Sequence, residues 1–223
     1  MQTQTLGSSS RRKTRKSCAL LLVAVFIAGP LPALAQAPSE PTTFRVREGD
    51  TAIQFTITKW SVFKEEGRFR NFNGSILYDP KHPEASRVEF EIRVASIDTK
   101  IDTRNRVLLS EDFFHADRYP TMSFRSTRVV SAGKDTFQVT GALTIRGVTQ
   151  TITVPVKLLG FHTLTDADER VNIAGFETSF TLDRTAFGVN GTRWSGGQLI
   201  LGSEVTVTLL VSVENRVESA RRN

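Results

Sequence analysis

The stretch Arg87-Val-Glu-Phe-Glu-Ile-Arg-Val94 alternates strictly between polar and apolar side chains. Successive side chains of a β-strand point to opposite faces, so its apolar residues, Phe90 among them, share one face while the charged residues face water. The same two-residue period returns along residues 44–215. These residues therefore predict a mostly β-stranded domain whose antiparallel sheet must bury one face against a second sheet or by curling on itself.

The spacing of these periodic segments predicts eight strands, or nine, joined mainly by connections of hairpin length. A meander of about eight such strands closes most economically into an up-and-down barrel. The period fails over Asp102 to Phe114, where Val107, Leu108, Glu111 and Phe114, at spacings of one, three and three, predict the one short helical segment. It also fails over Trp60 to Glu66, which fits a short helix or a wide loop. The predicted fold is an all-β, antiparallel eight-stranded barrel.

Residues 1–35 have the composition of a cleavable signal peptide. Five basic residues, Arg11 to Lys16 with Thr14 between them, precede an uncharged apolar run from Cys18 to Ala28. Ala33-Leu34-Ala35 supplies the small-x-small pattern of a cleavage site. The apolar run is about half of the roughly 20 residues needed to cross a bilayer, so we expect export and cleavage before Gln36 instead of a membrane anchor.

Removal of this leader changes the charge balance of the chain. The leader holds five of the 29 Lys and Arg residues and no acidic residue, which leaves 24 basic against 23 acidic residues. A mature chain so close to neutral gives no reason to expect binding to nucleic acid. Cys18, the only cysteine, lies in the leader, so no disulfide or thiolate chemistry is expected in the mature protein.

The two ends of the mature chain lack the strand period. Residues 36–43 are polar and rich in proline, and residues 216–223 are charged. Both segments are predicted to be disordered, the first as a linker and the second as a basic tail. Arg216, Arg221 and Arg222 could contact anionic lipid, although three charges are too few to anchor a protein to a membrane.

The sequence carries no recognisable catalytic or metal-binding constellation. Its three histidines form none of the spacings of zinc sites, and there is no G-x-S-x-G, P-loop or dinucleotide fingerprint. An enzyme acting on a lipid would need an acid, base or nucleophile inside the barrel, and only His115, Asp112 and Lys59 are candidates. We therefore predict a protein that is not an enzyme and that needs no cofactor or metal.

Phenylalanine is the prominent residue of the mature chain. Fourteen of its fifteen copies follow the leader, against two Tyr and two Trp in the whole chain. Phenylalanine supplies apolar area without a polar group, which is unlike a surface that binds sugars or nucleic acid. Because interior side chains can fill a small barrel or line a cavity, the period alone favours a packed core over a ligand cavity.

Several stretches together resemble the YceI-like family of lipocalin-like, polyisoprenoid-binding periplasmic proteins. The resemblance spans nearly the whole mature chain. It rests on Gly67-x-Phe69-x-x-Phe72-x-Gly74, on Ser110-Glu-Asp-Phe-Phe114 with Tyr119-Pro120 and Phe124-x-Ser126, on Gly141 to Thr149, on Gly175-Phe176, and on Arg184-Thr-Ala-Phe-Gly188. Each motif is weak alone, but their order and spacing together are specific.

The resemblance implies an antiparallel barrel, crossed by a helical segment, that holds the chain of an isoprenoid or an isoprenoid quinone in an elongated apolar tunnel. Where many family members have histidine this chain has Lys59, and where they read R-D-x-H-L-R-S it has Arg104-Asn-Arg-Val-Leu-Leu-Ser110. Lys59, Arg104 and Arg106 are expected to favour an anionic or quinone-like head. The ligand-binding residues expected on this basis are Phe55, Phe69, Phe90, Phe113, Phe114, Phe124, Phe137, Phe180, Lys59 and Arg104. If Phe113 and Phe114 are helical, they point about 100° apart and only one is expected to reach the lumen.

The first functional hypothesis is therefore an exported carrier or store of a long-chain isoprenoid lipid or quinone in the periplasm. The alternative is a stress-response or interaction module with a filled barrel, whose partner is a protein or a membrane and which holds no ligand. Edge strands of an incompletely closed barrel could also pair two copies into a homodimer.

Overall fold

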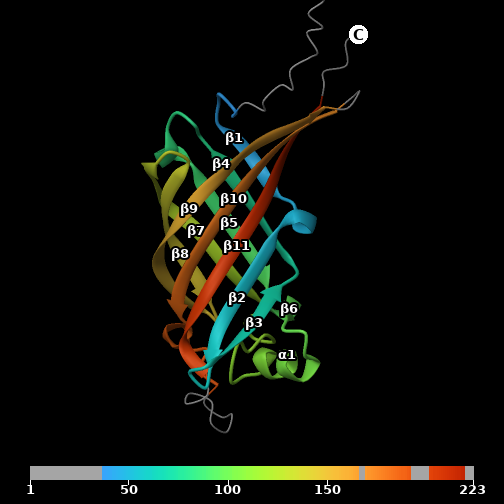
Figure 1. Ribbon diagram of the computed structural model, residues 1–223, viewed down its shortest axis with the longest axis vertical. Coiled ribbons are helices and arrows are strands. Elements are labelled where there is room, and N and C mark those ends of the chain that lie inside the picture. The colour runs from blue at the N-terminus through green and yellow to red at the C-terminus, as the bar shows by residue number, and fades with distance from the viewer. Residues whose placement is uncertain (1–36, 166–168, 192–200, 219–223) are drawn as a thin grey trace, which may run out of the picture. The chain divides into compact units, whose positions relative to one another are not determined.

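The computed structural model describes residues 37–165, 169–191 and 201–218. Figure 1 shows these residues as a β-barrel with one α-helix at its lower end. None of the helices in these ranges combines the length and the apolarity needed to span a membrane. The strands are β1 Thr42–Val46, β2 Ala52–Lys59, β3 Phe63–Phe69, β4 Phe72–Tyr78, β5 Arg87–Arg93, β6 Ile97–Asp98, β7 Thr121–Gly133, β8 Thr136–Ile145, β9 Val148–Thr165, β10 Glu169–Asp183 and β11 Leu201–Glu218, and the α-helix is α1 Asp102–Leu109.

These eleven segments make a closed barrel of eight strands, because three strands are each broken into two pieces. The order around the sheet is β1-β4-β5-β7-β8-β9-β10-β11, and β1 pairs with β11 to close the ring. β2, β3 and β6 continue β1, β4 and β5 past the breaks, since β2 pairs with β11 and with β3, and β3 pairs with β6. The predicted eight-stranded, antiparallel, up-and-down barrel with one short helix is confirmed.

Short irregular segments occupy the three breaks. The 3₁₀ turn Glu48–Asp50 separates β1 from β2, residues 70–71 separate β3 from β4, and the 3₁₀ turn Val94–Ser96 separates β5 from β6. Val94 therefore ends the alternating stretch 87–94 in a turn and not in the strand. The alternation itself is maintained, because Val88, Phe90 and Ile92 all face the inside of the barrel.

Three details differ from the sequence-based predictions. Trp60 to Glu66 is neither a helix nor a wide loop: residues 60–62 form a tight turn and β3 begins at Phe63. The predicted helix is shorter than expected, because α1 ends at Leu109 and turns lead from there to Phe114. Strand pairing also extends beyond the predicted domain, with Thr42 at the start of β1 and residues 216–218 in β11 paired with β10. The predicted signal peptide, 1–35, lies outside the described residues.

The buried side chains form separate clusters and leave the middle of the barrel hollow. One cluster gathers near α1 around Phe113 and Phe187, a second joins β1, β10 and β11 around Phe44 and Phe176, and a third lies on β7, β8 and β9 around Val139. Members of all three clusters border one internal cavity. The packed core that the period alone favoured is therefore wrong for this barrel.

Candidate ligand cavity

The cavity inside the barrel has a volume of about 570 Å³. This is within the range of about 300–1,000 Å³ that is usual for ligand pockets. Along β11 its wall extends from Leu201 to Val211, which corresponds to about 30 Å of strand, or about 25 Å along the axis of a barrel whose strands tilt by about 40°. The side chains on this wall are mainly Val, Ile, Leu and Phe. The space is long and apolar, a shape that suits an extended hydrocarbon chain.

All ten side chains that the sequence predicted for the site lie on the wall of this cavity. They are Phe55, Phe69, Phe90, Phe113, Phe114, Phe124, Phe137, Phe180, Lys59 and Arg104. Both Phe113 and Phe114 reach the wall, because they lie in the turns after α1 and not in a regular helix. Contact of these residues with a ligand stays a prediction.

Glycines keep phenylalanine rings against the wall and out of the lumen. Phe55 pairs with Gly67 across β2 and β3. A Cβ atom at Gly67 would lie only 2.2 Å from Cζ of Phe55, so the ring lies directly over the glycine. Phe124 covers Gly141 in the same way, with its Cζ 2.6 Å from the position of a Cβ atom there. An aromatic ring that covers a cross-strand glycine adds apolar area to the wall while leaving the centre open.

Residues of α1 and of the hairpin of β2 and β3 line one end of the cavity, which we call its mouth. The charged side chains of Lys59, Glu65 and Arg104 line the cavity there and are each partly exposed, by 23–29%. The carboxylate of Glu65 accepts a hydrogen bond from Lys59 Nζ at 3.4 Å and one from Arg104 Nη1 at 2.5 Å. Glu65 therefore bridges the strand to the helix and offsets one of the two positive charges. The preference of these cations for an anionic or quinone-like head stays a prediction.

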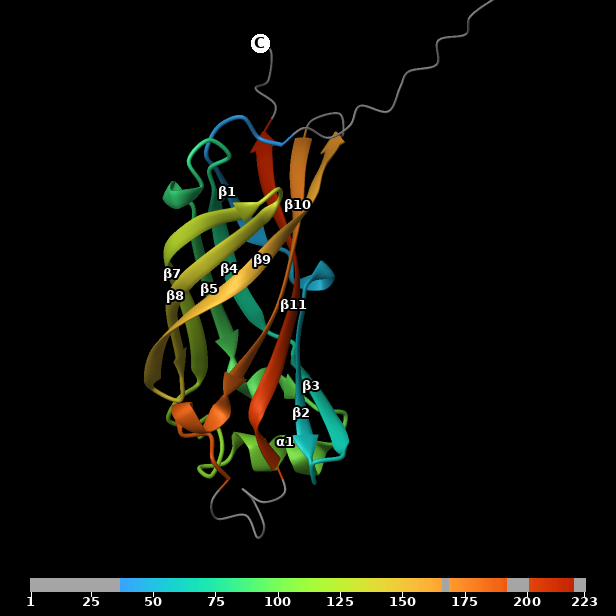
Figure 2. The same ribbon diagram turned by 60° about the vertical axis from the view of Figure 1, so that its left-hand side comes forward.

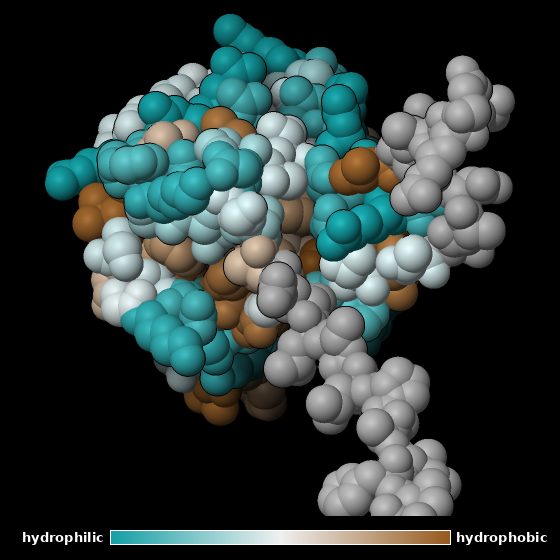
Figure 3. Space-filling view, turned by 90° about the horizontal axis from the view of Figure 1, so that it is seen from above, coloured by the Kyte–Doolittle hydropathy of each residue, from teal (hydrophilic) through white to brown (hydrophobic). Residues whose placement is uncertain are grey.

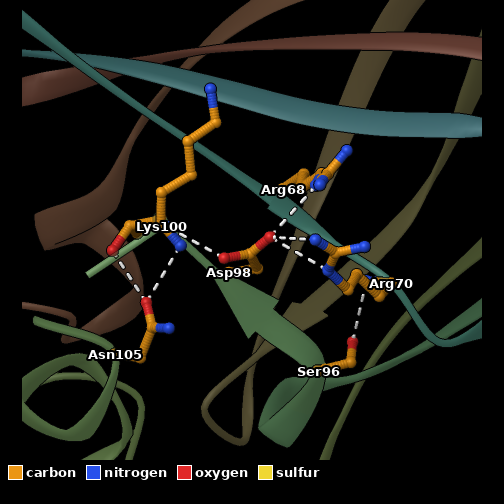
Figure 4. Close-up of polar contacts among 7 residues, drawn as sticks. Arg68, Arg70, Ser96, Asp98, Lys100 and Asn105 are labelled. Carbon is orange, nitrogen blue, oxygen red and sulfur yellow. Dashed lines mark hydrogen bonds and ion pairs between the residues drawn. The ribbon is translucent and has the colours of Figure 1, made fainter. Parts of the chain in front are cut away.

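A polar network fastens the segment that carries α1 to the barrel (Figure 4). Asp98 accepts hydrogen bonds from Arg68, from Arg70 and from the amide of Lys100. The pKa of Asp98 is lowered from 3.8 to about 2, mainly by the hydrogen bond from the Lys100 amide and next by that from the Arg70 guanidinium. Asn105 on α1 accepts hydrogen bonds from the amide and the hydroxyl of Thr99, at 2.9 and 2.7 Å. The helix is thus positioned at the mouth by side chains on both of its sides.

A buried arginine closes the cavity wall near the start of β11. The guanidinium of Arg184 donates hydrogen bonds to the carbonyls of Val189, Asn190, Leu201 and Gly202. Desolvation by burial lowers the pKa of Arg184. Carbonyl groups accept from four of its five N–H donors, so Arg184 holds the turn after β10 against β11.

The other two candidates for lipid chemistry lie away from the cavity. His115 stacks edge-on against Tyr119, with ring centroids 5.8 Å apart, and Asp112 accepts a hydrogen bond from the Gly191 amide through its backbone carbonyl. Neither is among the side chains on the wall, and Lys59, which is, pairs with Glu65. Over the described ranges, no group of three or more His, Cys, Asp or Glu residues could hold a metal ion.

The opposite end of the barrel is mixed in character. Seen from above, hydrophilic groups surround hydrophobic patches on this end (Figure 3). Arg216, part of the predicted basic tail, pairs here with Glu214 at 2.8 Å and with Glu169 at 3.3 Å. The pKa of Arg216 is raised, mainly by its hydrogen bond with Glu214. Of the three tail arginines predicted to contact lipid, only Arg216 lies within the described residues, and it is engaged in these two pairs. Arg221 and Arg222 lie outside the described residues.

Sequence reasoning missed Glu65 and Tyr78, which also line the cavity. The pKa of Tyr78 is raised, mainly by burial and further by the negative charges of Asp135 and Asp79. The two-residue period would have found Glu65 if it had been continued back from Phe69 through Gly67, since all three share the inner face of β3. Tyr78 ends the strand period that already includes Ile76, so the same extension would have found it.

A closed, eight-stranded antiparallel barrel around an apolar cavity defines the fold class of this molecule as a lipocalin-like β-barrel. Residues 44–213 match the YceI-like domain family. UPF0312 proteins of Azotobacter vinelandii and Pseudomonas aeruginosa are 33% and 37% identical over 169 residues, which are 75% of this chain and 83% of each relative. The chain belongs to the YceI-like family.

Solved structures show the same fold. Burkholderia cenocepacia BcnA superposes with a TM-score of 0.64 at 26% identity, covering 75% of this chain and 98% of BcnA. The Campylobacter jejuni YCEI protein gives a TM-score of 0.57 at 24% identity over 72% of this chain and 88% of its own. A polyisoprenoid binding domain from Saccharophagus degradans also gives 0.57, at 16% identity over 78% and 99%.

Proposed function

We propose that this protein binds the chain of an isoprenoid lipid or isoprenoid quinone inside the barrel and serves as its carrier or store in the periplasm, without catalysing a reaction. The observation that carries the proposal is the long apolar cavity of about 570 Å³. Burial contributes about 0.8 kcal/mol per methylene, or about 4 kcal/mol for a five-carbon isoprene unit, before the cost of association. Chain burial alone can therefore supply the affinity.

The mouth of the cavity favours an uncharged head group. Glu65 already pairs with both Lys59 and Arg104 and offsets one of their two positive charges. A phosphate would have to displace this carboxylate or approach it, and like charges at close range repel. A quinone carbonyl or a hydroxyl needs only one hydrogen bond donor, which either cation supplies without leaving Glu65. We therefore infer that an isoprenoid quinone fits the mouth better than a prenyl phosphate.

The likeness to a polyisoprenoid binding domain, at 16% identity, supports only the barrel fold on which the proposal rests. Export to the periplasm is part of the proposal because residues 1–35 have the composition of a signal peptide. The alternative is an interaction module without a ligand. It assumes a filled barrel, whereas this barrel encloses a cavity.

Mass spectrometry of an organic extract tests the proposal, with the mature protein purified from its native envelope in the absence of detergent. Val207 lies on the cavity wall, and its neighbour Thr208 faces solvent. We expect about one isoprenoid lipid per wild-type molecule, the same amount in Thr208→Trp, and little in Val207→Trp, in which the indole occupies the lumen. A clean wild-type extract, together with failure to take up added prenyl lipids, would refute the proposal.

A further inference from the structure

The turn between β2 and β3 exposes large apolar side chains beside the mouth of the cavity. Trp60 is 55% exposed, Val62 74%, and Phe63 59%, and Ile101, just before α1, is 45% exposed. We call these four residues the apolar tip. Figures 1 and 2 agree that the β2–β3 turn and α1 lie at the same end of the barrel. Exposed apolar residues gathered in one place generally mark an interaction surface.

The backbone of the turn gives no reason for a tryptophan there. Trp60 and Ser61 both have positive φ, 51° and 59°, and the Val62 amide donates to the Lys59 carbonyl at 3.2 Å. Turn positions with positive φ favour Gly and Asn, because a side chain costs about 1–2 kcal/mol in the left-handed region. A bulky residue kept at a strained position is a reason to look for a functional role.

The aromatic rings of the tip are organised outside the barrel. Trp60 meets Phe63 edge-on, with ring centroids 6.1 Å apart, and Lys59 Nζ lies 4.4 Å from the centre of the Trp60 ring. An indole with a cation beside it is suited to the interface between lipid head groups and hydrocarbon, where tryptophan is enriched. The tip therefore has the chemistry of a shallow membrane anchor.

Cations outnumber anions around the apolar tip. Glu65 is engaged with two of the cations, and Glu66 and Asp102 are the other acidic residues close to it in the β2–β3 and α1 segments. The basic residues of the same segments are Lys59, Lys64, Lys100, Arg104 and Arg106. An excess of basic residues next to exposed apolar ones complements the surface of an anionic bilayer, where each contributes about 1 kcal/mol.

The tip is continuous with the cavity. Lys59, Ile101 and Arg104 line the cavity as well as the mouth, and Phe63 pairs with Lys59 next to the turn. We propose that the apolar tip docks the barrel onto an anionic lipid bilayer, with the mouth of the cavity facing the membrane. The passage of cargo through that mouth rests on the proposed function, whereas docking itself does not require any cargo.

Vesicle binding tests the docking. The mature protein, freed of lipid, is sedimented with protein-free vesicles of phosphatidylcholine that contain 30% phosphatidylglycerol or none. We expect binding to the anionic vesicles and at least tenfold weaker partitioning for Trp60→Ser/Phe63→Ser. The control Leu159→Ser/Leu210→Ser removes two side chains of similar exposure from the outer wall of the barrel and should bind as the wild type does. In a Trp194→Phe background, the emission of Trp60 should shift to the blue on binding.

Three results would overturn the docking proposal: no binding of the wild type, equal binding of the tip variant, or equally strong binding to vesicles without phosphatidylglycerol. Binding to native membranes but not to protein-free vesicles would also overturn it and would assign the tip to a protein partner. Uptake of a prenyl ligand is measured separately and should be unchanged in the tip variant, because neither Trp60 nor Phe63 lines the cavity. Loss of docking and loss of cargo binding are thereby distinguished.

Discussion

Gly67→Ala is predicted to destabilise the barrel through one contact, that with the ring of Phe55. A Cβ atom at position 67 would lie 2.2 Å from Cζ of Phe55 and 2.7 Å from Cε1, whereas ordinary contact begins at 3.4 Å. The ring lies over β3 and has to swing away from the wall towards the lumen. Overpacking of this kind costs about 1–3 kcal/mol of the free energy of unfolding.

The same substitution should have the opposite sign once the ring is removed. In a Phe55→Ala background the new methyl group has no ring to displace, and alanine in a strand is more stable than glycine by about 0.5–1 kcal/mol. The coupling energy between the two positions is therefore predicted at about 1.5–4 kcal/mol, well above the roughly 0.5 kcal/mol expected for independent sites. Gly49→Ala is the control, because nothing lies within 4 Å of its Cβ position.

Urea unfolding of the lipid-free protein, followed by circular dichroism, gives the four free energies of this cycle. Additive effects of Gly67→Ala and Phe55→Ala would refute the reasoning, since they would mean that the ring does not depend on the glycine. A ligand-uptake assay on Gly67→Ala provides an independent readout, because a ring displaced into the lumen should reduce the uptake of prenyl lipids.

Three further predictions concern the mouth and its helix. Asp98→Asn should lower the thermal midpoint more at pH 5 than at pH 2. The pKa of Asp98 is lowered from 3.8 to about 2, so its contribution to stability is full well above pH 3.8 and is lost as the pH falls through about 2. A difference between the two proteins that is the same at both pH values would contradict this. Asn105→Ala leaves the buried amide of Thr99 without its partner, which costs about 1–3 kcal/mol. Hydrogen exchange should accelerate in α1 and stay unchanged in β8. Uniform acceleration would show that the helix is not held locally. Glu65→Gln removes the carboxylate between Lys59 and Arg104. A prenyl phosphate should then bind about fivefold more tightly at this part-exposed site, while the affinity for an isoprenoid quinone should change less than about twofold. Titration of both ligands measures this, and equal changes in affinity would remove the argument for an uncharged head.

The strands were predictable wherever the apolar alternation is complete, as in β5 and β11. It is incomplete in β3, where Glu65 and Gly67 precede Phe69 on the inner face. Gly67 stands under the ring of Phe55 and Glu65 pairs with two cations. Both roles depend on partners in other elements, so neither leaves a trace in the local pattern.

The wall of the cavity was also more predictable than its mouth. A phenylalanine on the inner face of a strand must point inwards whatever its neighbours are, so Phe55, Phe90 and Phe124 followed from the period alone. The partner of Arg104, in contrast, is 39 residues away on another element. Whether the barrel is filled or hollow depends on how rings lie over glycines, which spacing cannot express.

The break between β5 and β6 leaves part of the barrel wall without backbone pairing. Backbone pairing joins β5 to β7, but in the described part of the chain none joins β6 to β7. At this level the wall is completed by α1 and the turns after it, held by side chains such as Asn105 and Arg104. Apolar side chains of the same segment also pack against the core, the buried Phe113 among them. This part of the wall therefore depends on side-chain contacts and not on the β-ladder, so it can be weakened by substitution while every backbone pair of the sheet stays in place.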